Sequence, residues 1–291
     1  GLHFGVTASV ADDKTEVTKW TYNTKIPSYG ATGWWDKSAY KEGMVLGDIW
    51  GLQFDRFLTE DDFNADGSLK AGLPDQTKVF PAGYQFAPGD VLYKDLDNNG
   101  EIVKQTNTND KGDLSVIGNA LPRLQFGLNL DAAWKGFDIS MFFQGVAKRK
   151  LWAAGNQVLP GFTTGEPFYK GAEDYWTPEN TDAFYPRPMD YKQSASGNYS
   201  VNDRYLLNMA YLRLKTFTVG YSLPKVWLSK FKVQGLRVYF TGENLFTIDG
   251  VKPAIDPEIG IRTASGKSDQ RNFGRSYPYQ KTVSFGIQLS L

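Results

Sequence analysis

One acidic segment in the first half of the sequence has residue types and spacing suited to binding a metal ion. Asp95, Asp97 and Asn99 are spaced by two, and Gly100 and Glu101 follow. Oxygen ligands at this spacing can wrap around a hard cation, the glycine allows a sharp turn, and the seventh position supplies a backbone carbonyl. The pattern therefore predicts a calcium loop that begins at Asp95 and takes its backbone ligand from Glu101.

The twelfth position of this loop departs from the usual pattern. It is Thr106, where a calcium loop normally has a bidentate carboxylate. Asp110 or Asp113 would have to replace that ligand, and we include Asp113 in the predicted set. A plain turn rich in Asp and Asn stays open as the alternative.

An upstream segment repeats part of the same spacing. Its twelfth position is Leu73, which cannot ligate a cation, so we interpret it as a turn. The repeated positions are Asp62, Asn64, Asp66 and Gly67.

Residues for catalysis are scarce. The chain has no cysteine, and its one histidine, His3, lies in a predicted strand. Serine triads and histidine-ligated metal sites therefore lack a base or ligands. A β-rich glycoside hydrolase needs only two carboxylates, and 32 acidic residues always offer pairs, so this alternative stays open without positive support. We predict no enzymatic activity and no organic cofactor.

Aromatic residues gather near the start of the chain and again within residues 149–208. Such rings could stack on sugar rings or on peptide side chains. Packing within loops or anchoring at a membrane surface is the competing interpretation. Trp34, Trp35 and Trp50 belong to the first group, and Tyr185 belongs to the second. The residues that we predict to contact substrate are Trp152, Tyr175, Trp176 and Arg187.

The overall composition narrows the class of partner. Lys and Arg total 32 and so do Asp and Glu, so the formal net charge is zero. The chain therefore has no overall positive charge that would attract nucleic acid. No run of about 18 apolar residues is present, which excludes a membrane-spanning helix. Aromatic residues make up 15% of the chain, a content that suits sugar-binding surfaces or the aromatic girdles of membrane barrels.

Several segments alternate between apolar and polar residues as β-strands do. The clearest are 283–291, 124–134 and 137–143, and Lys135 and Gly136 predict a tight turn between the last two. Residues 211–221 and 236–241 read as strands, and so, less regularly, do residues 44–57 and the start of the chain. We expect six or seven strands and no amphipathic helix.

Two long irregular segments, 58–122 and 149–208, separate these strands. Loops of that size are unusual in a compact soluble domain, but outer-membrane barrels combine long extracellular loops with short periplasmic turns. Strands of about 10 residues also suit a tilted crossing of the hydrocarbon layer. The sequence therefore predicts an all-β protein, part of an antiparallel transmembrane β-barrel. The alternative is a soluble β-sandwich that binds carbohydrate or mediates adhesion.

An ordered series of short motifs resembles the C-terminal region of SusC-like TonB-dependent transporters. It runs from about residue 42 to the end of the chain. The motifs are GDVLYKDLDNNGEI (89–102), VIGN (116–119), WKGFD (134–138), FQG (143–145), YLRLK (211–215), GYSLP (220–224), RVY (237–239), ENL (243–245), DPE (256–258) and FG (285–286).

This resemblance implies a protein of the bacterial outer membrane with a barrel of about 22 strands and a plugged lumen. It implies that this chain is the C-terminal part of the barrel, and that the plug, the TonB-contacting segment and the other strands lie outside it. A SusD-like lipoprotein would cover the extracellular mouth. The implied function is energy-coupled import of bulky nutrients, either oligosaccharides or peptides.

Overall fold

A computed structural model describes most of the chain. All structural statements below concern the described residues, which are 1–21, 42–107, 110–153, 155–162, 167–189, 197–229, 233–252, 255–258, 263–264, 267–268 and 277–291.

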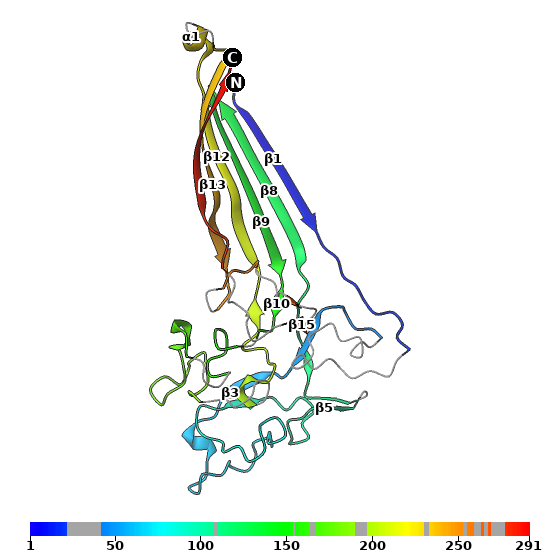
Figure 1. Cartoon of the computed structure of the whole chain (residues 1–291). Coiled ribbons are helices and arrows are strands. Elements are labelled where there is room, and N and C mark those ends of the chain that lie inside the picture. The colour runs from blue at the N-terminus through cyan, green and yellow to red at the C-terminus, as the bar shows by residue number, and fades with distance from the viewer. Residues whose placement is uncertain are drawn as a thin grey trace.

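Six long strands form one antiparallel sheet in the order β1-β8-β9-β12-β13-β16 (Figure 1). Each strand has 9 to 15 residues, which agrees with the strands expected from the alternation of apolar and polar positions. Their bounds are β1 His3–Ala11, β8 Arg123–Trp134, β9 Phe137–Lys148, β12 Tyr211–Ser222, β13 Gly235–Asp249 and β16 Thr282–Ser290.

The register of the sheet places apolar residues on one face throughout. Since neighbouring side chains in a strand point to opposite faces, rows of paired residues share a face. One apolar row crosses all six strands through Phe4, Ala132, Ile139, Val219, Phe240 and Phe285. The adjacent row on the other face is small or polar and consists of Gly5, Asp131, Ser140, Thr218, Thr241 and Ser284.

The apolar face is open to the surroundings, most clearly on the outer strands. Phe4 is 65% exposed and Phe285 is 82% exposed. A β-sandwich would cover such a face with a second sheet. All other sheets among the described residues have two strands, so the structure does not support the soluble sandwich that we kept as an alternative.

Short connections gather at the end of the sheet that also holds both termini (Figure 1). Lys135 and Gly136 join β8 to β9 with φ values of 48° and 91°. Two residues with positive φ form the hairpin turn whose twist matches the flanking strands, so the predicted turn is confirmed. The connection from β12 to β13 carries the short helix α1 (Lys225–Leu228). No helix among the described residues has the length and apolar character needed to cross a membrane.

Long connections occupy the opposite end of the sheet (Figure 1). Residues 12–122 join β1 to β8, residues 149–210 join β9 to β12, and residues 250–281 join β13 to β16. Their small strands are β2 Asp48–Gly51, β3 Phe54–Phe57, β4 Val91–Tyr93, β5 Lys104–Asn107, β6 Asp110–Gly112, β7 Ser115–Asn119, β10 Lys150–Leu151, β11 Leu207–Asn208, β14 Thr263–Ala264 and β15 Lys267–Ser268. The 3-10 turns are η2 Glu60–Asp62, η3 Lys170–Ala172 and η4 Gly197–Tyr199.

Residues 44–57, predicted as one strand, form two short strands instead. These are β2, which pairs with β7, and β3, which pairs with β4, and neither joins the six-stranded sheet. The second long connection holds this segment, because the Leu52 amide donates to the Val201 carbonyl over 2.8 Å. A Cβ on Gly51 would lie 2.8 Å from that same carbonyl oxygen, so only glycine permits this approach.

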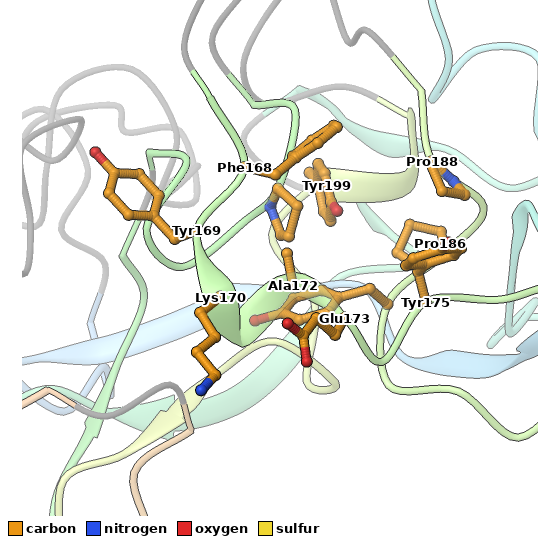
Figure 2. Close-up of a pocket in the computed structure, with 11 residues that line it drawn as sticks. Phe168, Tyr169, Lys170, Ala172, Glu173, Tyr175, Pro186, Pro188 and Tyr199 are labelled. Atoms are coloured by element: carbon orange, nitrogen blue, oxygen red, sulfur yellow. The ribbon is translucent and has the colours of Figure 1, made fainter.

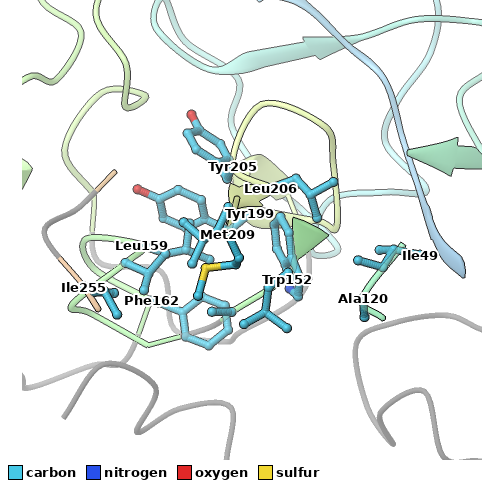
Figure 3. Packing of buried hydrophobic residues seen from close by; sticks show 14 of the residues in the cluster. Ile49, Ala120, Trp152, Leu159, Phe162, Tyr199, Tyr205, Leu206, Met209 and Ile255 are labelled. Carbon is cyan, nitrogen blue, oxygen red and sulfur yellow. The ribbon is translucent and has the colours of Figure 1, made fainter. Parts of the chain in front are cut away.

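Two hydrophobic cores stabilise the long connections. The first joins residues from 49 to 255, and Figure 3 shows its Trp152, Met209 and tyrosine side chains packed together. The second contains Leu52, Val91, Tyr93 and Ile102 among its buried members. Since a segment needs buried apolar area to offset the entropy of ordering, these cores explain how such long connections fold.

Candidate ligand-binding site

A buried ionic network joins the first and second long connections. Asp90 is fully buried, and the Arg187 guanidinium donates to its Oδ1 from Nε over 2.9 Å. The Tyr84 hydroxyl and the Asn198 side-chain amide donate to the same oxygen, each over 2.9 Å, and the Ala87 amide donates to Oδ2. A buried carboxylate is tolerated only when it is paired and hydrogen-bonded in this way. The network therefore fixes the two connections against each other, and the guanidinium of Arg187 is occupied by Asp90.

The four residues predicted to contact substrate lie in different environments. Trp152 is 2% exposed in the first core, and Trp176 is 7% exposed in the second core. The ring of Trp176 lies against Gly89, where a Cβ would approach it to 2.5 Å. Tyr175 alone presents a large open surface, with 40% exposure. Trp50 packs against the second core, and Trp34 and Trp35 lie outside the described residues.

Tyr175 lines a pocket of about 360 Å³ within the second long connection. In Figure 2, Phe168 and Tyr199 lie at one end of the pocket, Pro186 and Pro188 along one side, and Lys170 and Glu173 at the other end. Pockets that bind small ligands have this size and are mostly apolar with a few polar groups. The full lining is Pro160, Phe168, Tyr169, Lys170, Ala172, Glu173, Tyr175, Tyr185, Pro186, Pro188 and Tyr199.

The inner part of this pocket is held rigidly. The Tyr185 amide donates to the Asp174 carbonyl over 2.9 Å, and its hydroxyl donates to the Val158 carbonyl over 2.9 Å. Burial raises the pKa of Tyr185 to about 12, so the hydroxyl stays protonated as a donor. The rings of Tyr185 and Tyr205 stack with centroids 6.0 Å apart. The floor of the pocket is therefore formed before any ligand arrives.

The acidic loop brings three carboxylates together. Oxygen atoms of Asp95, Asp97 and Asp113 all lie within 4.8 Å of one another. Asp113 is fully buried and accepts hydrogen bonds from the amides of Leu96 (2.8 Å) and Val103 (2.7 Å). The fold thus places Asp113 where the predicted calcium loop needs its distant carboxylate.

The remaining predicted ligands have other contacts. The Asn99 side-chain oxygen accepts from the Glu101 amide over 2.8 Å, and the Glu101 carboxylate forms an ion pair with Lys78. In the upstream echo, Asp62 binds Arg56 through two hydrogen bonds, as expected of a structural turn. Calcium binding at the acidic loop stays a prediction.

Comparison with known proteins relates the chain to a family of receptors. No protein-family model matches it. It is 29% identical over 86% of its length to TonB-dependent receptor P3 of Formosa agariphila, and 32% identical over 67% to TonB-dependent receptor P26 of the same organism. It is also 25% identical over 80% to TonB-dependent receptor SusC of Bacteroides thetaiotaomicron.

This chain is a homologue of the TonB-dependent receptors, SusC among them. The matched regions cover 22%, 19% and 22% of those three relatives, so the chain spans about a fifth of their length. Solved structures agree on the fold. The RagAB peptide transporter matches 99% of this chain with a TM-score of 0.62 at 20% identity, over 27% of its own chain. RagAB in the 'closed-closed' state gives 0.59 at 19% identity, with the same coverage of both chains.

Most of the pocket in this TonB-dependent receptor homologue escaped prediction from the sequence. Tyr175 and Tyr185 are recognisable in the sequence as candidate aromatic residues, but Phe168, Lys170, Glu173 and the prolines are not. The segment 185–188 alternates Tyr and Arg with Pro, a pattern that could have marked a rigid surface. Only the fold brings this segment beside residues 168–175.

Proposed function

We propose that the protein to which this chain belongs imports a bulky nutrient across the bacterial outer membrane in a TonB-dependent manner. One observation carries the proposal. In a homologue of TonB-dependent receptors, a sheet with one apolar and one polar face has its long connections at one end and its short turns at the other. This is the arrangement of a barrel wall that separates lipid from a polar lumen.

The rest of the barrel wall comes from other parts of the protein. Within the described residues, β1 and β16 each have one edge without a neighbouring strand. An open edge in hydrocarbon would leave backbone groups unpaired at a cost of several kcal/mol each. We therefore place these edges against the remaining strands, with a plug inside the lumen. The short turns face the periplasm, and the long connections face the exterior.

A SusD-like lipoprotein is the partner that we propose at the exterior end. Homology to SusC and the structural match to RagAB support this assignment. The cargo, an oligosaccharide or a peptide, would be captured between the lipoprotein and the long connections. It would then pass inward when TonB acts on the plug. In this proposal the chain binds its cargo without chemical change.

The test combines purification with uptake. The native protein is extracted from outer membranes in mild detergent, intact masses of the co-purifying chains are measured, and nutrient uptake is compared between cells with and without TonB. We expect a plug-bearing chain, a lipoprotein, and uptake that stops without TonB. Recovery of a lone soluble chain would replace the proposal with a soluble binding module, and turnover of a chromogenic glycan would replace it with a hydrolase.

A further inference from the structure

We propose that the pocket around Tyr175 binds a peptide through an aromatic or proline side chain of that peptide. Its role in uptake rests on the proposed function above, but the binding itself can be measured without transport. The pocket has a volume of about 360 Å³, enough for a ring and its neighbouring backbone.

The rim and the floor of the pocket offer rings to a ligand. Phe168 and Tyr175 are 56% and 40% exposed, so their faces are available. Tyr185, Pro186 and Tyr199 are buried and form a floor that does not need to rearrange. Grooves lined by aromatic residues bind proline-rich or aromatic segments because rings pack on rings and a stiff ligand loses little entropy.

The polar groups on the floor of the pocket are already used within the protein. Tyr185 uses its amide, its carbonyl and its hydroxyl within the protein, the carbonyl accepting from the Trp176 amide over 3.0 Å. The Tyr169 carbonyl accepts from the Ala172 amide over 2.9 Å. Pro160, Pro186 and Pro188 have no N–H group at all.

A sugar ring carries several hydroxyl groups, and each one buried without a partner lowers affinity. Apart from Lys170 and Glu173 at one end, the lining contains no charged or amide side chain to pair with adjacent hydroxyls. A peptide side chain that ends in a ring makes no such demand. The chemistry of the lining therefore favours a peptide over an oligosaccharide.

Opposite charges at one end of the pocket fit the polar parts of the same ligand. Lys170 and Glu173 both lie there and are exposed (Figure 2). Lysine donates to carbonyl or carboxylate oxygens, and glutamate accepts from N–H or ammonium groups. A peptide offers both kinds of group beside a side chain, whereas a neutral sugar has no charge to complement.

The experiment measures binding to the full-length protein with its lipoprotein in mild detergent. The probes are acetyl-Gly-Pro-Phe-Pro-Gly-amide, the same peptide with Ala in place of Pro and Phe, and maltohexaose. Tyr175→Ala and Phe168→Ala remove rim rings, and Tyr277→Ala is the matched control because Tyr277 is 96% exposed and lies outside the pocket. Melting temperatures check that all variants fold.

We expect the ring-bearing peptide to bind, the alanine peptide to bind at least about tenfold more weakly, and each rim variant to lose about threefold to tenfold in affinity. Tyr277→Ala should leave affinity unchanged. The proposal fails if the ring-bearing peptide does not bind, if the rim variants bind it like the wild type, or if maltohexaose is the probe whose binding they lose. TonB-dependent uptake is measured separately, so a failure of the pocket assignment would leave the proposed import function intact.

Discussion

At the scale of single residues, buried carboxylates hold the long connections together in two different ways. Asp90 is neutralised by Arg187. Asp113 instead accepts hydrogen bonds from the backbone amides of Leu96 and Val103, and Asp95 and Asp97 lie beside it. Among the described residues, no Lys or Arg forms an ion pair with these three carboxylates. A divalent cation would relieve their mutual repulsion.

Calcium is therefore predicted to stabilise the protein through Asp113. Adding Ca²⁺ at about 100 times its dissociation constant should stabilise the folded acidic loop by about 2.7 kcal/mol, read as increased hydrogen-exchange protection of residues 95–113. Asp113→Asn should remove this response. Asp66→Asn, in the upstream turn, should retain it. If Ca²⁺ protects the loop equally in Asp113→Asn, the ligand assignment is wrong.

The Arg56–Asp62 pair gives a prediction for pH. The Arg56 guanidinium donates to Asp62 over 2.6 and 2.7 Å, and it lowers the pKa of Asp62 from 3.8 to about 2. A lowered carboxyl pKa stabilises the fold above the ordinary value, and this stabilisation is lost as pH falls from about 4 through 2. Pepsin cleavage around residues 57–63 should thus increase across this window.

Asp62→Asn is the matching variant. It should lose roughly 1–2 kcal/mol of local stability, because a charge-assisted pair is removed, and should be cleaved readily at pH 4 with little further change at lower pH. Asp66→Asn serves as the control, because Asp66 accepts its hydrogen bonds from the amide and the hydroxyl of the nearby Ser68. Equal cleavage of the wild type and Asp62→Asn at pH 4 would show that the pair does not hold this turn.

At the scale of elements, the alternation within each strand becomes a property of the whole sheet. The tight Lys135–Gly136 turn starts β9 directly opposite β8, with Trp134 paired to Phe137. Register then places apolar residues of every strand on the same face. Against β9, a bulge at Lys215 in β12 shifts the pairing by one residue, and Lys215 bonds Glu258 over 2.8 Å instead of disturbing the apolar rows.

Adjacent residues of β16 test which face contacts lipid. Phe285→Arg should destabilise the folded protein in a bilayer by about 2–4 kcal/mol if Phe285 lies near the midplane, because a charge enters hydrocarbon. Ser284→Arg, on the opposite face, should cost much less. Urea unfolding in lipid vesicles gives both values. Similar costs for the two variants would contradict the assignment of faces.

At the scale of the whole molecule, the two ends of the long sheet differ in structure. The termini, the hairpin turn and α1 lie at one end, and the packed long connections lie at the other (Figure 1). The network at Asp90 and the two cores tie the first and second connections into one folded region. In the proposed barrel, this region would face the exterior and contact the cargo.

Labelling of intact cells tests this orientation. The chain contains no cysteine, so a single introduced thiol can be followed once cysteines elsewhere in the protein are replaced. A membrane-impermeant maleimide should label Lys70→Cys, in an exposed part of the first connection, and should label Lys225→Cys in α1 only after cells are lysed. Labelling of both sites in intact cells would contradict the assigned orientation.

The sequence by itself determined the strands and the hairpin turn. These features depend on neighbouring residues, because a period of two and a two-residue turn are local properties. The ordered motifs also indicated the receptor family. Residues 44–57 were predicted less well, because the Leu52 amide donates a hydrogen bond to the Val201 carbonyl, which lies far along the chain.

Only the tertiary structure decided how the long connections work. It placed Asp113 beside Asp95, engaged Arg187 with Asp90 across 97 positions, and buried Trp152 and Trp176 in separate cores. It also assembled the pocket around Tyr175 from separate stretches between residues 160 and 199. Such contacts follow no sequence period, because they arise from side chains that meet only after distant segments have packed.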